Sequence, residues 1–168
     1  MQITTSFNVI GTNNPVFIIA EAGVNHNGDI KLAHKLIDAA ASAGADAVKF
    51  QTFLTDELVS NDAPFAEHHI ANVKDAVSHY DLLKKLELPF GSFQELKTHC
   101  KEENILFLST PYDIPSAELL INMQTELIKI SSSEMMNYPL LDVIGRSKIP
   151  VILSTGMNSW EEIEDSVN

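Results

Sequence analysis

Five short apolar runs alternate with segments of helical period, and this alternation limits the possible folds more than any other feature of the chain. A short apolar run followed by an amphipathic segment is typical of a βα unit, and repeated units build a parallel sheet covered by helices. The runs are apolar throughout, as expected for strands that are covered on both faces. We therefore predict an α/β fold with strands at residues 16–20, 46–50, 105–109, 127–130 and 150–154.

Helix signals fall between the apolar runs. Residues 30–43 repeat apolar side chains at helical spacing and are followed by Gly44, a common helix stop. A serine with a glutamate three residues later forms a capping box, which predicts helix starts at Ser92 and Ser159. Asn137 precedes a Tyr-Pro pair and predicts a further helix start.

One connection is much longer than a βα unit needs. Residues 52–91 place about forty residues between the second strand and the next helix, and long insertions of this kind often form lids or binding loops. The insertion has its own helical stretch at about residues 67–86. We interpret His68 and His69 within it as a solvated helix face rather than a metal site, because adjacent side chains on a helix point about 100° apart.

Composition excludes several classes of function. The 168 residues are enough for one domain, and no repeat or linker indicates a boundary. A net charge of -12, with Arg146 as the only arginine, argues against nucleic-acid and anionic-membrane surfaces. The N-terminus has no signal-like or membrane-spanning apolar core, so we expect a cytoplasmic protein. Cys100, the only cysteine, excludes an internal disulfide and is expected to be an ordinary helical thiol.

Polar side chains come at the end of each predicted strand. Glu21 follows the first strand, while Lys49 and Lys129 lie within or directly after apolar runs. A lysine is rarely buried without an anionic partner, because taking an ammonium group out of water costs several kcal/mol. In α/β proteins the ligand binds where the carboxyl ends of the strands converge. We therefore expect both lysines to face a common anion there.

The donor set indicates what kind of anion would bind. Two ammonium groups with the hydroxyls of Thr110, Ser132 and Ser154 can hold a phosphate or a carboxylate. Glu21 and Glu134 would serve as acid-base groups or as acceptors for sugar hydroxyls. Neither a Walker nor a GxGxxG spacing is present, so nucleotide binding is unsupported.

Three other interpretations stay open at this point. A single lysine at a strand end can extend its ammonium group to solvent, although two lysines and a glutamate at the same end of three strands favour a site. A Schiff-base aldolase acting on pyruvate would use Lys49 or Lys129 as the nucleophile, with its pKa lowered by burial. The chain could also be a non-enzymatic fragment that binds a ligand or assembles with another chain.

Five motifs in order, IAEAGVNHNGD, GADAVKFQT, LSTPYD, KISSSEMMNYPLL and PVILSTGM, resemble the N-terminal part of the sialic acid synthase family. These bacterial enzymes make N-acetylneuraminate, legionaminate or pseudaminate, and the resemblance covers about residues 14–165. It implies a (β/α)8 TIM barrel followed by a small antifreeze-like domain that caps the partner's active site in a homodimer. The implied reaction condenses phosphoenolpyruvate with the open-chain aldehyde of an N-acylated mannosamine-type sugar, releases phosphate and requires a divalent metal, Mn or Mg.

The resemblance also assigns roles to individual positions. It implies that phosphoenolpyruvate is held by five residues and that three others lie near the sugar and the attacking water. A carboxylate there would stabilise the cationic character that develops at carbon two, and the metal would polarise the aldehyde oxygen. The phosphoenolpyruvate set is Lys49, Thr110, Lys129, Ser132 and Ser154, and the sugar set is Glu21, Gln51 and Glu134.

Two departures from the family pattern affect these expectations. Ser131 and Ser133 stand in KISSSE where the family commonly has the glycines of KIGSGE, so we expect a stiffer loop that keeps Ser132. A TIM barrel needs about 250 residues. Residues 1–168 are therefore expected to form about the first five βα units. We expect the remaining strands, two metal-binding histidines and the capping domain beyond Asn168, and no metal ligand within the chain. Alone, the chain is expected to be inactive and, with exposed strand edges, prone to self-association.

Overall fold

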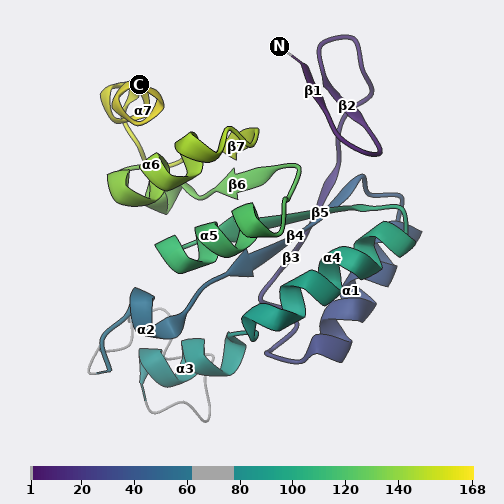
Figure 1. Ribbon diagram of the computed structural model, residues 1–168, viewed down its shortest axis with the longest axis horizontal. Coiled ribbons are helices and arrows are strands. Elements are labelled where there is room, and N and C mark those ends of the chain that lie inside the picture. The colour runs from purple at the N-terminus through teal and green to yellow at the C-terminus, as the bar shows by residue number, and fades with distance from the viewer. Residues whose placement is uncertain (1, 62–77) are drawn as a thin grey trace.

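The computed structural model describes residues 2–61 and 78–168, and these confirm the predicted α/β architecture (Figure 1). Three parallel strands form a sheet in the order β3-β4-β5, and β6 and β7 form a second parallel pair that packs beside β5. Each of the five predicted strands is present. Their bounds are β3 (Ile19–Gly23), β4 (Ala47–Thr52), β5 (Leu106–Pro111), β6 (Ile128–Ile130) and β7 (Val151–Leu153).

The first of these strands begins at Ile19, three residues later than the predicted start at Val16. The backbone N–H of Ile18 donates to the carboxylate of Asp46 at 2.7 Å, and the Ile18 carbonyl accepts from the Asp46 and Ala47 amides. The regular ladder starts with the pair of Ile19 and Ala47. Glu21 therefore lies inside β3 rather than after it, and Val16 is left 84% exposed.

Helices connect the strands and cover one side of the sheet. The long helices that follow strands are amphipathic, and their buried positions pack on the strands. A three-residue 3-10 helix, η2 (Ser132–Glu134), follows β6. The α-helices are α1 (Ile30–Ser42), α2 (Thr55–Leu58), α3 (His79–Leu86), α4 (Phe90–Glu102), α5 (Ile114–Asn122), α6 (Tyr138–Ser147) and α7 (Trp160–Val167).

The helix starts agree with the capping signals at two positions and differ at one. Ser159 and Glu162 form the predicted capping box of α7, and Asn137 caps α6 by accepting from the Leu140 amide. The predicted start at Ser92 is wrong. The helix α4 begins at Phe90, and the Ser92 amide already donates to the carbonyl of Pro89 at 2.9 Å, so Ser92 lies inside the first turn.

One feature of the fold was not predicted, and another was predicted and is confirmed only in part. A hairpin of β1 (Gln2–Thr4) and β2 (Val9–Gly11) was not predicted, because strands of three residues give too short a pattern. In the long insertion, α3 confirms the end of the predicted helix at residues 67–86. Residues 67–77, with His68 and His69, lie outside the described residues.

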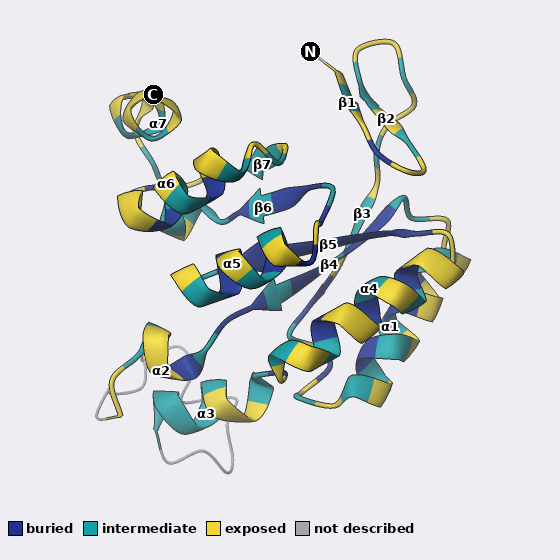
Figure 2. Ribbon diagram, viewed as in Figure 1, coloured by how far each residue is buried: buried dark blue, intermediate teal, exposed yellow. Residues whose placement is uncertain are grey.

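The central strands β4 and β5 are largely buried (Figure 2), and their alternate residues enter two different apolar clusters. In β4, Val48 and Phe50 point to the helices, whereas Ala47 points to the opposite, inner face. This follows from the two-residue period of a strand. The inner cluster is small and consists of Ala47, Leu106, Leu108 and Leu127, with Ile3, Ile10, Phe17, Ile19 and Ile152 partly buried around it.

Large apolar side chains are exposed near both outer strands. Met157 and Trp160, which follow β7, are 97% and 81% exposed, and Ile18, just before β3, is 54% exposed. This agrees with the expected exposure at the edges of an open sheet, while self-association stays a prediction. Within residues 2–61 and 78–168, none of the helices combines the length and the apolar character that crossing a membrane requires.

A substitution at Gly28 tests the close packing between the loop after β3 and α3. Gly28 has a φ of 74°, and an added Cβ would overlap the backbone carbonyl oxygen of Lys85. We expect Gly28→Ala to lower the free energy of unfolding by about 2 kcal/mol or more, because it adds a backbone clash to left-handed strain. Urea denaturation measures this change.

Two other glycines provide matched controls for this substitution. Gly44 has a φ of 77° but open space around it, so Gly44→Ala should cost only the conformational strain, about 1 kcal/mol. Gly145, inside α6, also has open space, so Gly145→Ala should stabilise by about 0.5–1 kcal/mol. Equal losses at Gly28 and Gly44 would contradict the proposed clash.

His26 predicts a pH dependence of stability. Its ring is 1% exposed, its Nδ1 accepts from the Gly28 amide at 3.1 Å, and burial lowers its pKa from 6.5. Since the unfolded chain binds the proton more readily, this contribution is complete above about pH 6.5 and declines as the pH falls toward the lower folded-state pKa. We expect His26 to add a slope of up to about 1.4 kcal/mol per pH unit in that window.

Denaturation of His26→Asn between pH 5 and 8 isolates this contribution. Asparagine keeps an acceptor for the Gly28 amide and does not titrate. Its free energy of unfolding should fall less steeply than that of the wild-type chain, and parallel curves would show that His26 does not contribute.

Candidate anion site at the strand ends

The inner face of each strand ends in polar side chains at the carboxyl end of the sheet. In β4, Lys49 and Gln51 follow Ala47 at two-residue spacing, so all three share the inner face. The strand register places Glu21 beside Lys49 and Thr110 beside Gln51. The fold thus brings four of the predicted site residues onto neighbouring strands at one rim.

Lys49 has an anionic partner within the chain. Its Nζ lies 2.6 Å from Oε2 of Glu21, and its side chain is only 13% exposed. Glu21 is 54% exposed, so its carboxylate connects a nearly buried ammonium group to solvent. This charge-assisted contact offsets the cost of burying Lys49 inside an apolar strand.

Lys129 lies close to the same two charges. Its Nζ donates to the carbonyl of Ile130 at 2.7 Å. Burial lowers the pKa of Lys129, the positive charge of Lys49 lowers it further, and the negative charge of Glu21 acts in the opposite direction. Because such effects weaken with distance, the two ammonium groups and the carboxylate lie near one another at this rim.

Thr110 and Gln51 line the same rim. Thr110 is 2% exposed, and its hydroxyl has no hydrogen-bond partner among the described residues. A buried polar group without a partner is unusual and requires an explanation. Nearby, a Cβ added at Gly23 would lie 3.2 Å from Oε1 of Glu21 and 3.9 Å from Nε2 of Gln51, so these two side chains meet above the glycine.

Ser132 and Ser154 lie in the segments that follow the adjacent strands β6 and β7, with Ser132 as the first residue of η2. The Ser154 amide donates to the Ile130 carbonyl at 3.1 Å, which continues the ladder past the end of β7. Asn158 joins the loops by donating its amide to the carbonyls of Ser132 and Gly156 at 3.0 and 2.8 Å. Both predicted serines therefore lie at the same end of the β6–β7 pair.

Glu134 is held at this rim by its own loop. Its carboxylate accepts from the Asn137 side chain at 2.9 Å and from the Ser133 hydroxyl at 3.1 Å. Burial raises the pKa of Tyr112, a hydrogen bond with the Ser131 side chain acts in the opposite direction, and the negative charges of Glu134 and Glu21 raise it further. Tyr112 is therefore a further residue of this region. Sequence reasoning did not select it, although it directly follows the polar end of β5.

The described residues at the rim do not form a set of three metal ligands. Within residues 2–61 and 78–168, only one set of three His, Cys, Asp or Glu side chains is arranged closely enough to share an ion, and it consists of Asp38, His99 and Glu103 on α1 and α4. The rim carboxylates of Glu21 and Glu134 are not part of such a set. The rim residues of this chain therefore do not fit a metal by themselves.

Cys100 is not part of the candidate site. It is buried in α4, and burial raises the pKa of its thiol to about 12. A protonated buried thiol is unreactive, which confirms the expectation of an ordinary helical cysteine.

Comparisons with known proteins agree with the fold and with the order of the motifs. An N,N'-diacetyllegionaminic acid synthase from Campylobacter jejuni is 45% identical over 90% of this chain and 45% of its own length. A protein of the same name from Legionella pneumophila is 41% identical over 94% of this chain and 44% of its own length. The chain thus spans less than half the length of these curated relatives.

A solved structure gives the same result for the fold. The N-acetylneuraminic acid synthetase from Leptospira borgpetersenii, crystallised with citrate, superposes with a TM-score of 0.84 and 41% identity over 99% of this chain and 54% of that chain. The strands and helices described above therefore form part of a TIM barrel. Residues 36–168 match the NeuB family, and the chain belongs to that family.

Proposed function

We propose that this chain supplies the phosphoenolpyruvate-binding part of a sialic-acid-type synthase. The whole enzyme would condense phosphoenolpyruvate with an N-acylated mannosamine-type sugar and release phosphate. The observation that carries this proposal is the placement of Lys49, Lys129 and Thr110 at the same rim, where the buried hydroxyl of Thr110 has no partner among the described residues. The names of the synthase relatives support the same reaction class.

The electrostatics of the rim suit a small, strongly charged anion. Two neighbouring ammonium groups repel each other, so both gain stability when a phosphate or carboxylate binds between them. We assign Lys49, Thr110, Lys129, Ser132 and Ser154 to phosphoenolpyruvate. The Leptospira relative was crystallised with citrate, which is also a multiply charged carboxylate.

The carboxylates beside this cationic region suit the proposed chemistry. Carbon three of phosphoenolpyruvate attacks the aldehyde carbon of the sugar, which leaves positive character at carbon two. Water then adds to carbon two, and phosphate leaves from the resulting intermediate. Glu21 and Glu134 would stabilise the positive charge and accept hydrogen bonds from the water or the sugar, and Gln51 would orient one of them.

We propose that the rest of the synthase is supplied outside these 168 residues. In this view the chain is the N-terminal portion of the barrel, and the remaining strands and an antifreeze-like capping domain complete a homodimeric enzyme. Because the rim does not fit a metal by itself, the ligands of the divalent ion, Mn or Mg, would also lie outside this chain. We propose a cytoplasmic location, which suits phosphoenolpyruvate as a substrate.

A Schiff-base aldolase acting on pyruvate is a second candidate function, favoured by one observation. Burial lowers the pKa of Lys129, which makes a neutral, nucleophilic amine more accessible. Borohydride treatment with pyruvate distinguishes the two reactions, because only a lysine imine is trapped as a covalent adduct. The synthase proposal expects neither Lys49 nor Lys129 to be modified.

Substitution of Lys129 tests the anion site. We expect Lys129→Met to weaken phosphoenolpyruvate binding at least tenfold in calorimetry, because it removes a partly buried ammonium group from the site while keeping a similar side-chain length. Lys35→Met, on the exposed face of α1, removes the same charge from the surface and should leave the affinity within about twofold. Equal losses in both variants would indicate a general charge effect rather than a site.

Thr110→Val separates a binding role from a structural role. The Thr110 hydroxyl is buried without a partner among residues 2–61 and 78–168, so its replacement by a methyl group should leave the free energy of unfolding unchanged or higher. Phosphoenolpyruvate binding should weaken about fivefold, the equivalent of one lost hydrogen bond of about 1 kcal/mol. A loss of stability with unchanged affinity would assign Thr110 to the fold instead.

A further inference from the structure

Two helices on the outside of the sheet present metal-ligating side chains to each other. His34 and Asp38 lie four residues apart on α1, and Glu95 and His99 lie four residues apart on α4. Residues at this spacing share one helix face. His34 Nε2 lies 2.9 Å from Glu95 Oε1, and His99 Nε2 lies 2.6 Å from Asp38 Oδ1.

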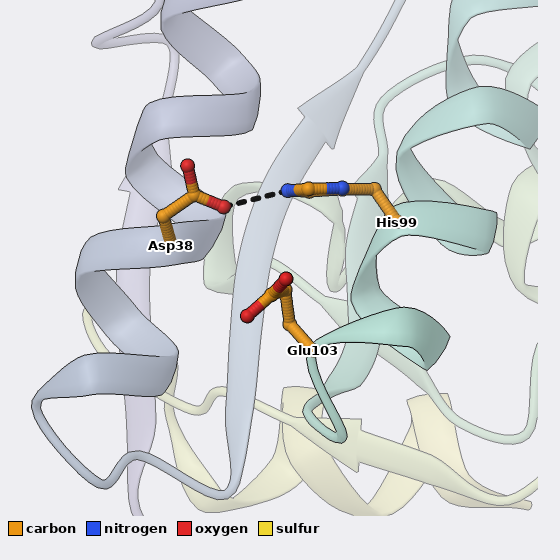
Figure 3. A group of neighbouring side chains, drawn as sticks. All are labelled: Asp38, His99 and Glu103. Atoms are coloured by element: carbon orange, nitrogen blue, oxygen red, sulfur yellow. Dashed lines mark hydrogen bonds and ion pairs between the residues drawn. The ribbon is translucent and has the colours of Figure 1, made fainter.

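Glu103 completes a set of three ligands with Asp38 and His99. Figure 3 shows Asp38 extending from α1 toward the ring of His99, with the Glu103 carboxylate beside them at the end of α4. One ligand atom from each residue lies within 4.8 Å of the others. Ligands bound to one ion at about 2.0–2.2 Å are about 3–3.5 Å apart, so small side-chain rotations would close the set.

His34 adds a second imidazole to the same surface. The ring centroids of His34 and His99 are 4.4 Å apart at an interplanar angle of 50°. Other side chains of the two helices, including Ile37 of α1 and Leu96 of α4, are buried in the core, so the backbones that carry the ligands are held in place. This arrangement reduces the ordering that ion binding would require.

We propose that α1 and α4 form a peripheral site for a divalent transition-metal ion, with Asp38, His99 and Glu103 as ligands and His34 as an additional donor. Imidazole combined with carboxylate suits Zn²⁺, Co²⁺ or Ni²⁺ better than Mg²⁺ or Ca²⁺, which prefer oxygen ligands alone. The described partners of Asp38 and Glu95 are the imidazoles of His99 and His34, and imidazole is itself a common ligand of these ions.

This site is separate from the anion site at the strand ends. Asp38 and His99 lie in the C-terminal halves of their helices, close to where β4 and β5 begin, whereas Lys49 and Thr110 lie toward the carboxyl ends of those strands. An ion bound there would not reach the substrates. It would join two adjacent helices and stabilise the folded state, since the unfolded chain does not hold the ligands together.

Metal titration of the tag-free chain tests the proposal. We expect excess Zn²⁺ to raise the melting temperature by about 5 °C or more and Mg²⁺ to have no comparable effect. Co²⁺ should give a visible absorption band on binding. Both Asp38→Asn and His99→Gln should weaken Zn²⁺ binding at least tenfold in calorimetry, because each removes a ligand.

Two comparisons keep the result interpretable if a variant folds less well. Asp38→Asn keeps the size of the side chain and can still hydrogen-bond to His99, so its melting temperature without metal should stay close to that of the wild-type chain. His79→Gln removes a histidine on α3, outside the cluster, and should keep the wild-type affinity. Equal affinity in the wild-type chain and Asp38→Asn, or no melting shift with Zn²⁺, would overturn the proposal.

Discussion

The two-residue period of strands that are buried on both sides governs this structure. One set of side chains enters the helix-facing core, which includes Val48, Phe50 and Phe107. The other set faces inward, where the apolar residues Ala47 and Leu108 form a small inner cluster. Because the same alternation continues to the carboxyl ends of the strands, every polar side chain placed there on the inner face lies at one rim. The fold and the candidate site therefore depend on the same periodicity.

The charges at that rim compensate one another within the chain. Lys49 is nearly buried, and its ammonium group lies 2.6 Å from the carboxylate of Glu21. Both of these charges affect the pKa of Lys129. Removing either member of such a group leaves a partly buried charge without its partner, which costs more than the pair itself contributes. The same compensation leaves two ammonium groups close together, and this is the property that suits a phosphate and a carboxylate on one small substrate.

The outer helices use titratable side chains in a different way. On α1 and α4, imidazoles and carboxylates pair across a surface that is partly open to solvent, without a lysine in the described pairs. The helices are positioned by their buried faces, so their outer faces are free to carry chemistry that the barrel does not need. Burial has the opposite effect at Cys100 on α4, where it makes the thiol unreactive.

The sequence by itself determined the α/β class, the order of the five strands, the caps at Asn137 and Ser159 and the residues at the rim, because these follow from local periodicity and local hydrogen bonding. Only the tertiary structure decided that Glu21 pairs with Lys49, that the Thr110 hydroxyl is buried with no partner in the described part of the chain, and that α4 begins before Ser92. It also brought His34 and Asp38 to Glu95 and His99, about sixty residues away along the chain. Contacts of this kind depend on how helices and strands pack, and the spacing of residues along one segment carries no information about its neighbour.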